Sequence, residues 1–312
     1  MDRIDAMKVF VATLDEGSLA GAGRLLKRSP AAVSRAIAFL EAHVGVELLH
    51  RTTRTIRLSE AGERYAAACR RILTELEEAE ILAIGEKSAP RGTLTLSAPP
   101  ISGEDILRPI VDGFLDAYPA VSARLLLLDR QVNLVEEGID VALRVGQLPD
   151  SSLIATRVGG DVRRVVVASP DYLAAHSPIV EPSDLAAHAI VAFTNFGLDS
   201  WSFSPAAGSS IPRTAHFVPR LTVNSVRAAM ASAIGGRGLT RLYSYHVADD
   251  VAAGRLEVVL ANAEFAPLPV HLLTPKGRAS APKVRAFIDF AAQRLRAEFG
   301  RLASEARDLA GD

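Results

Sequence analysis

Apolar and polar positions follow a helical spacing near the start of the chain. Apolar residues recur mostly every three or four positions over 4–16, and Gly17 follows them as a helix stop signal. Ser18 then has N-cap character for a short second helix that runs to Leu26. The pattern therefore predicts two helices joined by a tight turn.

A third helix is predicted directly afterwards. Ser29 is suited to cap it, because Pro30 falls at the first helical position, where a missing N–H does no harm. The apolar positions of this helix are spaced by four, three and four residues: Val33, Ile37, Leu40 and Val44. This stripe is expected to pack inward, which leaves Ala31, Ser34 and Arg35 on a free face near the helix start.

Basic residues concentrate in and around this helical segment. After Gly45 the chain is β-branched and basic, which predicts a small two-stranded wing that returns at 56–58. The window 24–57 holds seven lysines and arginines against two glutamates, a net charge of +5, so the rest of the chain carries −6 of the total of −1. A clustered basic patch of this kind is what phosphate binding requires.

A long helix is predicted from residue 59 or 60 to about 84. Its apolar positions form a heptad seam with spacings of four, three, four, three and four: Tyr65, Cys69, Ile72, Leu76, Ala79 and Ala83. Such a seam favours dimerisation of two subunits through this helix. An amphipathic helix packed on its own domain is the alternative, because fewer than three full heptads are present. Residues 85–92 are predicted to be a linker.

The remainder of the chain alternates between strand-like and helical runs. The first set comprises 94–97, 103–117, 121–128, 131–137 and 141–145, in the order strand, helix, strand, helix, strand. This order predicts a parallel doubly wound sheet with ligands at the carboxyl ends of its strands. A second set includes strands near 164–168, 190–193 and 239–243 and a helix at 225–234, and the chain closes with a strand at 270–274 and a helix at 282–299.

Candidate ligand-binding residues follow the predicted strands. Hydroxyl-bearing residues and prolines come after the first strand, a second group begins the 225–234 helix, and a third group ends the 190–193 strand: Ser97, Pro99, Pro100 and Ser102; Asn224 and Ser225; Phe193, Thr194 and Asn195. Two helix N-termini facing a cleft would favour a small polar or carboxylate-bearing metabolite. Ordinary helix capping explains the first two groups equally well.

Composition narrows the class of protein. A length of 312 residues exceeds one typical domain, and 49% apolar with 23% charged residues is typical of a globular multi-domain chain. The first residues mix charged and apolar side chains, so no signal peptide is expected, and no later run suits a membrane span. The single cysteine, Cys69, excludes an internal disulfide and suits a reducing compartment. We therefore expect a cytoplasmic protein.

The motifs of common enzymes are missing from the sequence. The seven histidines are scattered without HExxH spacing, there is no GxSxG motif, and Gly21-Ala22-Gly23 lacks the third glycine of a dinucleotide site. We expect neither catalysis nor a metal or cofactor.

The segment from Gly17 to Tyr65 closely resembles the LysR-type transcriptional regulators. The matching residues are Ser18, Ala22, Leu26, Ser29, Val33, Ser34, Arg35, Ile37, Leu40, Glu41, Gly45, Leu48, Arg51, Arg54, Leu58, Ser59, Ala61 and Gly62. Later stretches such as LVEEGIDVALRVG and PSDLAAH are similar to the CrgA-type subgroup of that family. The resemblance implies a winged helix-turn-helix, a dimerising linker helix, and a two-lobed α/β effector domain similar to periplasmic solute-binding proteins. A solute-binding protein is the alternative class, which the basic module and the missing signal peptide disfavour.

The domain boundaries expected from this resemblance are a DNA-binding domain at 1–58, a linker helix and hinge at 59–91, an effector domain at 92–300 and a tail at 301–312. Lobe I comprises about 92–162 and 266–300, and lobe II about 163–265. The residues expected to contact DNA are Ser18, Arg28, Ser29, Pro30, Ala31, Ser34, Arg35, Arg51, Thr52 and Arg54. An internal ion pair is the alternative role for Arg51. The expected partners are operator DNA, a small-molecule effector, further copies of the chain as a dimer or a dimer of dimers, and RNA polymerase.

Overall fold

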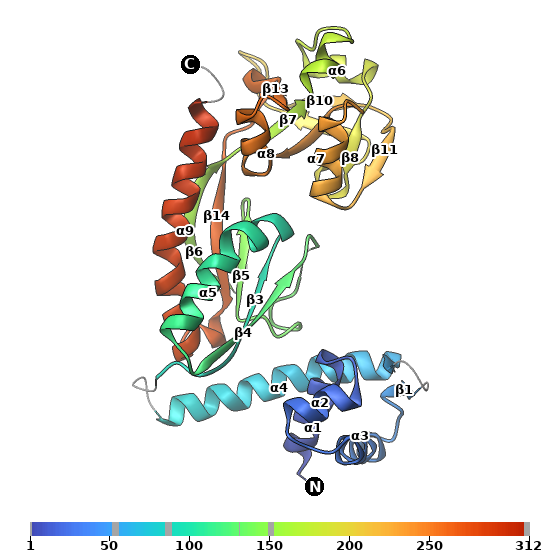
Figure 1. The fold of residues 1–312 in the computed structure, drawn as a ribbon, viewed down its shortest axis with the longest axis vertical. Coiled ribbons are helices and arrows are strands. Elements are labelled where there is room, and N and C mark those ends of the chain that lie inside the picture. The colour runs from blue at the N-terminus through green and yellow to red at the C-terminus, as the bar shows by residue number, and fades with distance from the viewer. Residues whose placement is uncertain (1, 52–55, 85–88, 131, 149–152, 309–312) are drawn as a thin grey trace.

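The computed structural model describes residues 2–51, 56–84, 89–130, 132–148 and 153–308 (Figure 1). The N-terminal domain contains the helices α1 (Arg3–Asp15), α2 (Leu19–Leu25) and α3 (Pro30–Val44) and the antiparallel strands β1 (Leu49–Arg51) and β2 (Ile56–Leu58). Each helix begins at a residue whose side chain accepts backbone N–H groups, namely Asp2, Ser18 and Ser29. Gly45 ends α3 in the left-handed conformation, with a φ of 75°.

The core of this domain contains the apolar stripe of α3. Val33, Ile37 and Leu40 are fully buried, together with Phe10 of α1 and Leu48 before the wing. The opposite face of α3 therefore lies at the surface, as its periodicity predicts.

The long helix α4 (Glu60–Ile84) leaves the N-terminal domain and passes below the rest of the molecule (Figure 1). Its first half packs on its own domain: Cys69 is fully buried, and the ring of Tyr65 lies 6.0 Å from that of Phe10. The heptad seam predicted to face a partner is therefore wrong for Tyr65 and Cys69. An apolar stripe of this spacing fits an intramolecular core as well as a coiled coil, and here α1 covers it.

Lobe I contains a five-stranded sheet in the order β4-β3-β5-β14-β6. Its strands are β3 (Gly92–Ala98), β4 (Val121–Leu127), β5 (Val141–Val145), β6 (Leu153–Val162) and β14 (Leu268–Pro275). Strands β4, β3 and β5 are parallel, whereas β14 runs antiparallel to β5 and β6, so the sheet is mixed. Helices α5 (Arg108–Ala117) and α9 (Pro282–Asp308) pack against it, with Phe114 and Phe287 in edge-to-face contact at 5.2 Å. A π-helix, η1 (Ser102–Leu107), precedes α5.

Lobe II is formed by the segment between β6 and β14. Strand β7 (Arg164–Ala168) lies between β12 (Thr240–Tyr243) and β13 (Glu257–Val259), while β8 (Val191–Phe193) pairs with β11 (Leu221–Val223) and β9 (Ser200–Phe203) with β10 (Arg213–His216). Its helices are α6 (Pro170–Ala174), α7 (Val226–Ile234) and α8 (Ser244–Ala252). Short 3-10 turns occupy Pro182–Ala187, Thr194–Phe196, Ala261–Ala263 and Lys276–Arg278. Because the chain returns through β14, lobe I receives strands from both sides of the crossing whereas lobe II is one continuous segment, and residues 92–308 form a two-lobed α/β unit.

The helix predicted at 131–137 does not form. Residue 131 lies outside the described residues, and the chain from 134 onward makes a turn that ends at Gly138 with a φ of 71°. The Asn133 side chain accepts the N–H groups of Val135 and Glu136, a local bond that competes with helix hydrogen bonding.

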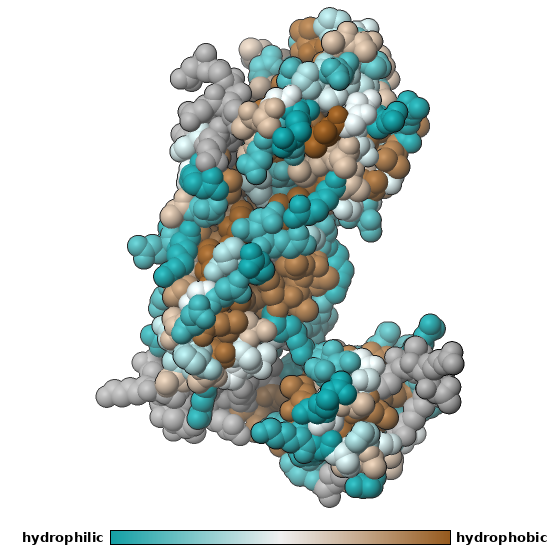
Figure 2. All heavy atoms as spheres, viewed as in Figure 1, coloured by the Kyte–Doolittle hydropathy of each residue, from teal (hydrophilic) through white to brown (hydrophobic). Residues whose placement is uncertain are grey.

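In the space-filling view, the N-terminal domain projects from beneath lobe I, and apolar side chains gather over part of lobe I (Figure 2). Within the described part of the chain, none of the helices has the length and apolar character needed to span a membrane.

Candidate functional site: DNA-binding face, domain junction and inter-lobe cleft

The start of α3 presents an exposed polar face. The Ser29 hydroxyl caps the helix by accepting the N–H of Ala32 at 3.2 Å, and Ser29, Pro30 and Ala31 are exposed. Arg35 is also exposed, one turn further along, and Ser34 is half-buried beside it. This face is opposite the buried stripe and offers a guanidinium and hydroxyl groups, which suit DNA phosphates and base edges.

Two of the predicted DNA contacts have structural roles inside the domain. Arg28 donates two hydrogen bonds to the Asp5 carboxylate, at 2.7 and 2.8 Å, which joins the turn before α3 to α1. The bond from Arg28 lowers the pKa of the Asp5 carboxyl, and Asp5 in turn raises the pKa of Arg28. The Ser18 hydroxyl accepts the N–H of Gly21 at 3.0 Å. Thr52, Arg54 and the side chain of Arg51 lie outside the described residues, so the predictions for the wing are untested.

Among the described residues of the α4 seam, Ile72, which is 39% exposed, and Ala79 face outward, whereas Leu76 is half-buried and lines a cavity beside lobe I. The side chain of Ala83 lies outside the described residues.

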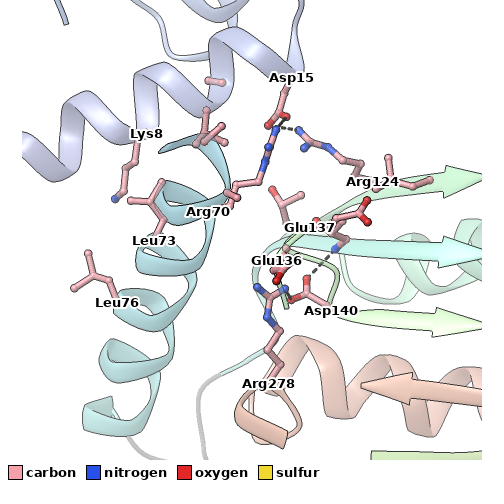
Figure 3. A pocket seen from close by; sticks show the side chains of 18 of the residues that line it. Lys8, Asp15, Arg70, Leu73, Leu76, Arg124, Glu136, Glu137, Asp140 and Arg278 are labelled. Atoms are coloured by element: carbon pink, nitrogen blue, oxygen red, sulfur yellow. Dashed lines mark hydrogen bonds and ion pairs between the residues drawn. The ribbon is translucent and has the colours of Figure 1, made fainter. Parts of the chain in front are cut away.

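A cavity of about 780 Å³ lies where α1 and α4 meet lobe I (Figure 3). On one side of it, Arg70 of α4 and Arg124 of β4 both point toward Asp15 at the end of α1. One oxygen of the Asp15 carboxylate pairs with Arg70 at 2.8 Å and the other with Arg124 at 2.8 Å. The Asp15 side chain is only 12% exposed. A single carboxylate thus joins the DNA-binding domain, the linker helix and the effector domain, and we call this contact the Asp15 bridge.

The opposite wall of the junction is held rigidly within lobe I. The buried Asp140 pairs with Arg278 at 2.8 Å and lies 3.6 Å from Lys283, and it accepts the backbone N–H of Thr95 at 2.8 Å. These bonds tie β3 to the segments before β5 and after β14.

A second cavity, of about 340 Å³, lies between the two lobes. Of the residues predicted to bind an effector, Pro99, Phe193 and Asn195 line it. Ser97 and Ser102 are fully buried next to it: Ser97 accepts a hydrogen bond from Arg144, and the Ser102 hydroxyl donates to the Pro99 carbonyl at 3.3 Å.

The other predicted effector residues do not line this cleft, namely Pro100, Thr194, Asn224 and Ser225. Asn224 and Ser225 are exposed, and the Ser225 hydroxyl accepts the N–H of Ala228 at 3.4 Å. For Ser225 the structure therefore shows the helix-capping role that was left open as the alternative.

The charged residues of the cleft were missed at the sequence level. Arg144 is the next-to-last residue of β5, and Asp129 follows β4, so both lie near carboxyl ends of parallel strands. The rule that ligands bind at such ends, applied to all three parallel strands rather than to β3 alone, would have found them. Tyr243, Tyr245 and His246 come from lobe II and line the opposite wall.

Burial changes the protonation of these groups. It lowers the pKa of the Arg144 guanidinium and raises the pKa of the Asp129 carboxyl, against the opposing effect of the Arg144 charge. Burial also lowers the pKa of His246 to about 3, so this imidazole is neutral at physiological pH. The cleft therefore presents the carboxylate of Asp129 and the guanidinium groups of Arg144 and Arg130, of which Arg130 is hydrogen-bonded to Glu137, on an otherwise uncharged lining.

Comparison with known proteins agrees with this geometry. Residues 4–63 match the model of the bacterial regulatory helix-turn-helix proteins of the lysR family, and residues 87–296 match the LysR substrate binding domain. The chain is 32% identical to the HTH-type transcriptional regulator CrgA of Neisseria meningitidis over 293 residues, covering 93% of this chain and 96% of that protein. It is 34% identical to an HTH-type transcriptional regulator of Xanthomonas campestris over 291 residues, covering 92% and 84%.

Solved structures agree as well. The CrgA structure superimposes with a TM-score of 0.58 at 31% identity, over 93% of this chain and 98% of that one. The full-length virulence activator AphB of Vibrio cholerae superimposes with a TM-score of 0.61 at 26% identity, over 93% and 98%. The resemblance inferred from the helix-turn-helix residues is thereby confirmed. The chain belongs to the LysR family of bacterial transcriptional regulators, DNA-binding proteins whose activity is modulated by a small-molecule effector.

Proposed function

We propose that the chain reads its operator through the start of α3, with Arg35 as the main base-contacting residue. The observation that carries this proposal is the position of Arg35: it is exposed on the face opposite Val33, Ile37 and Leu40, the stripe that anchors the helix. An arginine presented in this way can make two hydrogen bonds to a guanine edge in the major groove. The wing residues would then bind phosphates and set affinity more than sequence preference.

The test is substitution of Arg35 by alanine in the full-length protein. Because Arg35 is exposed, the fold should be unchanged, while loss of a bidentate base contact should cost about 1–3 kcal/mol and relax specificity at one base pair. Gel shifts with the natural promoter measure both effects. Arg108→Ala is the matched control, because it removes one exposed arginine from α5 in the effector domain. Unchanged affinity and sequence preference for Arg35→Ala would refute the assignment.

We infer that the protein acts as a dimer or a dimer of dimers, paired in part through the outward half of α4. Ile72 and Ala79 support this, because both are exposed at heptad spacing on the far half of the helix. Paired N-terminal domains would bind two half-sites of a roughly two-fold operator. Contact with RNA polymerase would complete an activating role. Such a protein works in the cytoplasm, where the chromosome is. It acts by binding DNA and an effector rather than by catalysis.

We infer further that the effector lies in the inter-lobe cleft and that an acidic group of it pairs with Arg144. Arg144 donates to the Ser97 hydroxyl at 3.0 Å and to the Leu143 carbonyl at 2.8 Å, and within the described residues no carboxylate lies within 4.0 Å of it. A half-buried guanidinium without an anion gains from a carboxylate ligand. No resident metal or cofactor enters this proposal.

The same two strands connect the cleft with the domain junction. Thr95 of β3 and Arg124 of β4 line the junction cavity, whereas Pro99 and Asp129, beyond the carboxyl ends of these strands, line the cleft. Arg124 and Asp129 are separated by about 17 Å of extended chain, at about 3.3 Å per residue. We propose that closure of the lobes on an effector shifts these strands and thereby the Asp15 bridge, which changes the tilt of the DNA-binding domain.

A further inference from the structure

Two opposite charges lie in the inter-lobe cleft without satisfying one another. Arg144 and Asp129 both line the cavity, and each affects the protonation of the other. Yet they form no ion pair within 4.0 Å, either with each other or with any other residue that the structure describes. The neighbouring Arg130 differs, because it forms two hydrogen bonds to Glu137 at 2.6 and 2.8 Å.

The separation of these charges has an energetic consequence. A half-buried charge without a partner at contact distance loses hydration without an equivalent gain, and the longer-range attraction between Arg144 and Asp129 offsets only part of this loss. A ligand with a single negative group would compensate Arg144 and leave Asp129 uncompensated. A ligand that carries both a cation and an anion compensates both at once.

Aromatic rings line the lobe II side of the same cavity. Phe196 contacts Tyr243 edge to face at 4.8 Å and lies 5.6 Å from Phe193, and Tyr243 stacks on Tyr245 at 5.8 Å. The apolar part of a ligand can pack against such rings, and their faces stabilise an ammonium group. The volume of about 340 Å³ limits the ligand to a small molecule.

We propose that the effector is a zwitterion of the amino-acid type, with its carboxylate on Arg144, its ammonium on Asp129, and its side chain against Phe196 and Tyr243. This inference rests on the assignment of the effector to the inter-lobe cleft and goes beyond it by naming the charge pattern of the ligand. It requires that removal of either charge from the ligand weakens binding.

The test uses the full-length chain and matched sets of probes. The twenty L-amino acids are screened by thermal shift, and each hit is compared by calorimetry with the amine that lacks its carboxylate and the acid that lacks its ammonium. For phenylalanine these probes are 2-phenylethylamine and 3-phenylpropanoate. At least one amino acid is expected to bind, and each singly charged analogue to bind at least about tenfold more weakly.

Variants identify the group that reads each charge. Asp129→Asn should abolish the preference for an amino acid over its acid analogue, whereas Arg144→Gln should weaken both. Arg108→Gln, a surface substitution in α5, should change neither. Failure of all twenty amino acids, or a preference for singly charged acids that Asp129→Asn does not change, overturns the zwitterion. If singly charged acids are preferred and Arg144→Gln weakens their binding, the assignment of the effector to the inter-lobe cleft still holds. If Arg144→Gln does not change their affinity, that assignment is overturned as well.

Discussion

Removal of Arg124 tests the Asp15 bridge without disturbing either domain. Arg124→Ala deletes the partner in lobe I, while Arg70 still pairs with the Asp15 carboxylate at 2.8 Å, so the N-terminal domain keeps its own ion pair. Arg124 is 39% exposed and Asp15 12% exposed, so solvent screens the pair in part. Pairs with such exposure contribute up to about 1 kcal/mol, which corresponds to a factor of about five in the docking equilibrium of the two domains.

Energy transfer between two dyes measures this equilibrium. Arg24 of α2 and Asp116 of α5 are exposed and suit substitution by cysteine for labelling. Cys69 does not compete for the dyes, because it is buried and burial raises the pKa of its thiol to about 11. Arg124→Ala should raise the ratio of separated to docked domains about fivefold. Arg108→Ala should leave this ratio unchanged.

A double-mutant cycle decides whether Arg124→Ala changes domain docking because it removes the ion pair with Asp15. In the Asp15→Asn background, Arg124→Ala should have little further effect, because the partner carboxylate is already gone. If the two substitutions acted additively, or if Arg124→Ala left the distance distribution unchanged, the Asp15 bridge would not hold the domains together.

Three further predictions concern other parts of the chain. Gly62→Ala should destabilise the N-terminal domain by more than about 2 kcal/mol in thermal unfolding, because its Cβ would clash with the Leu48 carbonyl oxygen; an unchanged melting temperature would contradict this packing. Ile72→Glu should weaken dimers in sedimentation, and wild-type sedimentation would remove this face of α4 from the interface. Burial lowers the pKa of His246 to about 3, so this side chain binds fewer protons in the folded chain than in the unfolded chain. The free energy of unfolding should therefore fall as pH drops from 6.5 toward 3. His246→Gln should flatten this dependence in thermal scans whereas the exposed His216→Gln should not, and equal slopes would refute the assignment.

The helices of the N-terminal domain could be predicted because local signals determine them. Ser29 and Pro30 define the start of α3 and Gly45 its end, and the buried stripe has the 3.6-residue period. Strand β6 was missed for the opposite reason. Its segment Leu153–Val162 contains two adjacent glycines and lacks clear alternation, and only pairing with β14, more than a hundred residues later, makes it a strand.

The candidate site was predicted only in part. Pro99, Phe193 and Asn195, which line the cleft, were named because they lie at or just beyond the ends of strands that the pattern identifies directly. Arg144 lies inside an apolar strand, where one arginine among hydrophobic residues gives no signal about the cavity it faces. No role was predicted for Asp15, because its partner Arg124 is distant in sequence and belongs to another domain. Contacts that form only when domains meet leave no local pattern in the sequence.

Selection of binding sites from randomised duplex DNA tests the central claim most directly. Purified full-length protein is incubated with the pool at physiological salt, and bound duplexes are amplified and sequenced over several rounds. The account predicts enrichment of a two-fold related sequence whose half-sites are separated by about one helical turn, 10–10.5 base pairs, or a multiple of it. Recovery of duplexes with no enriched sequence, under conditions in which the protein binds DNA, would contradict the assignment of α3 as a sequence-reading helix.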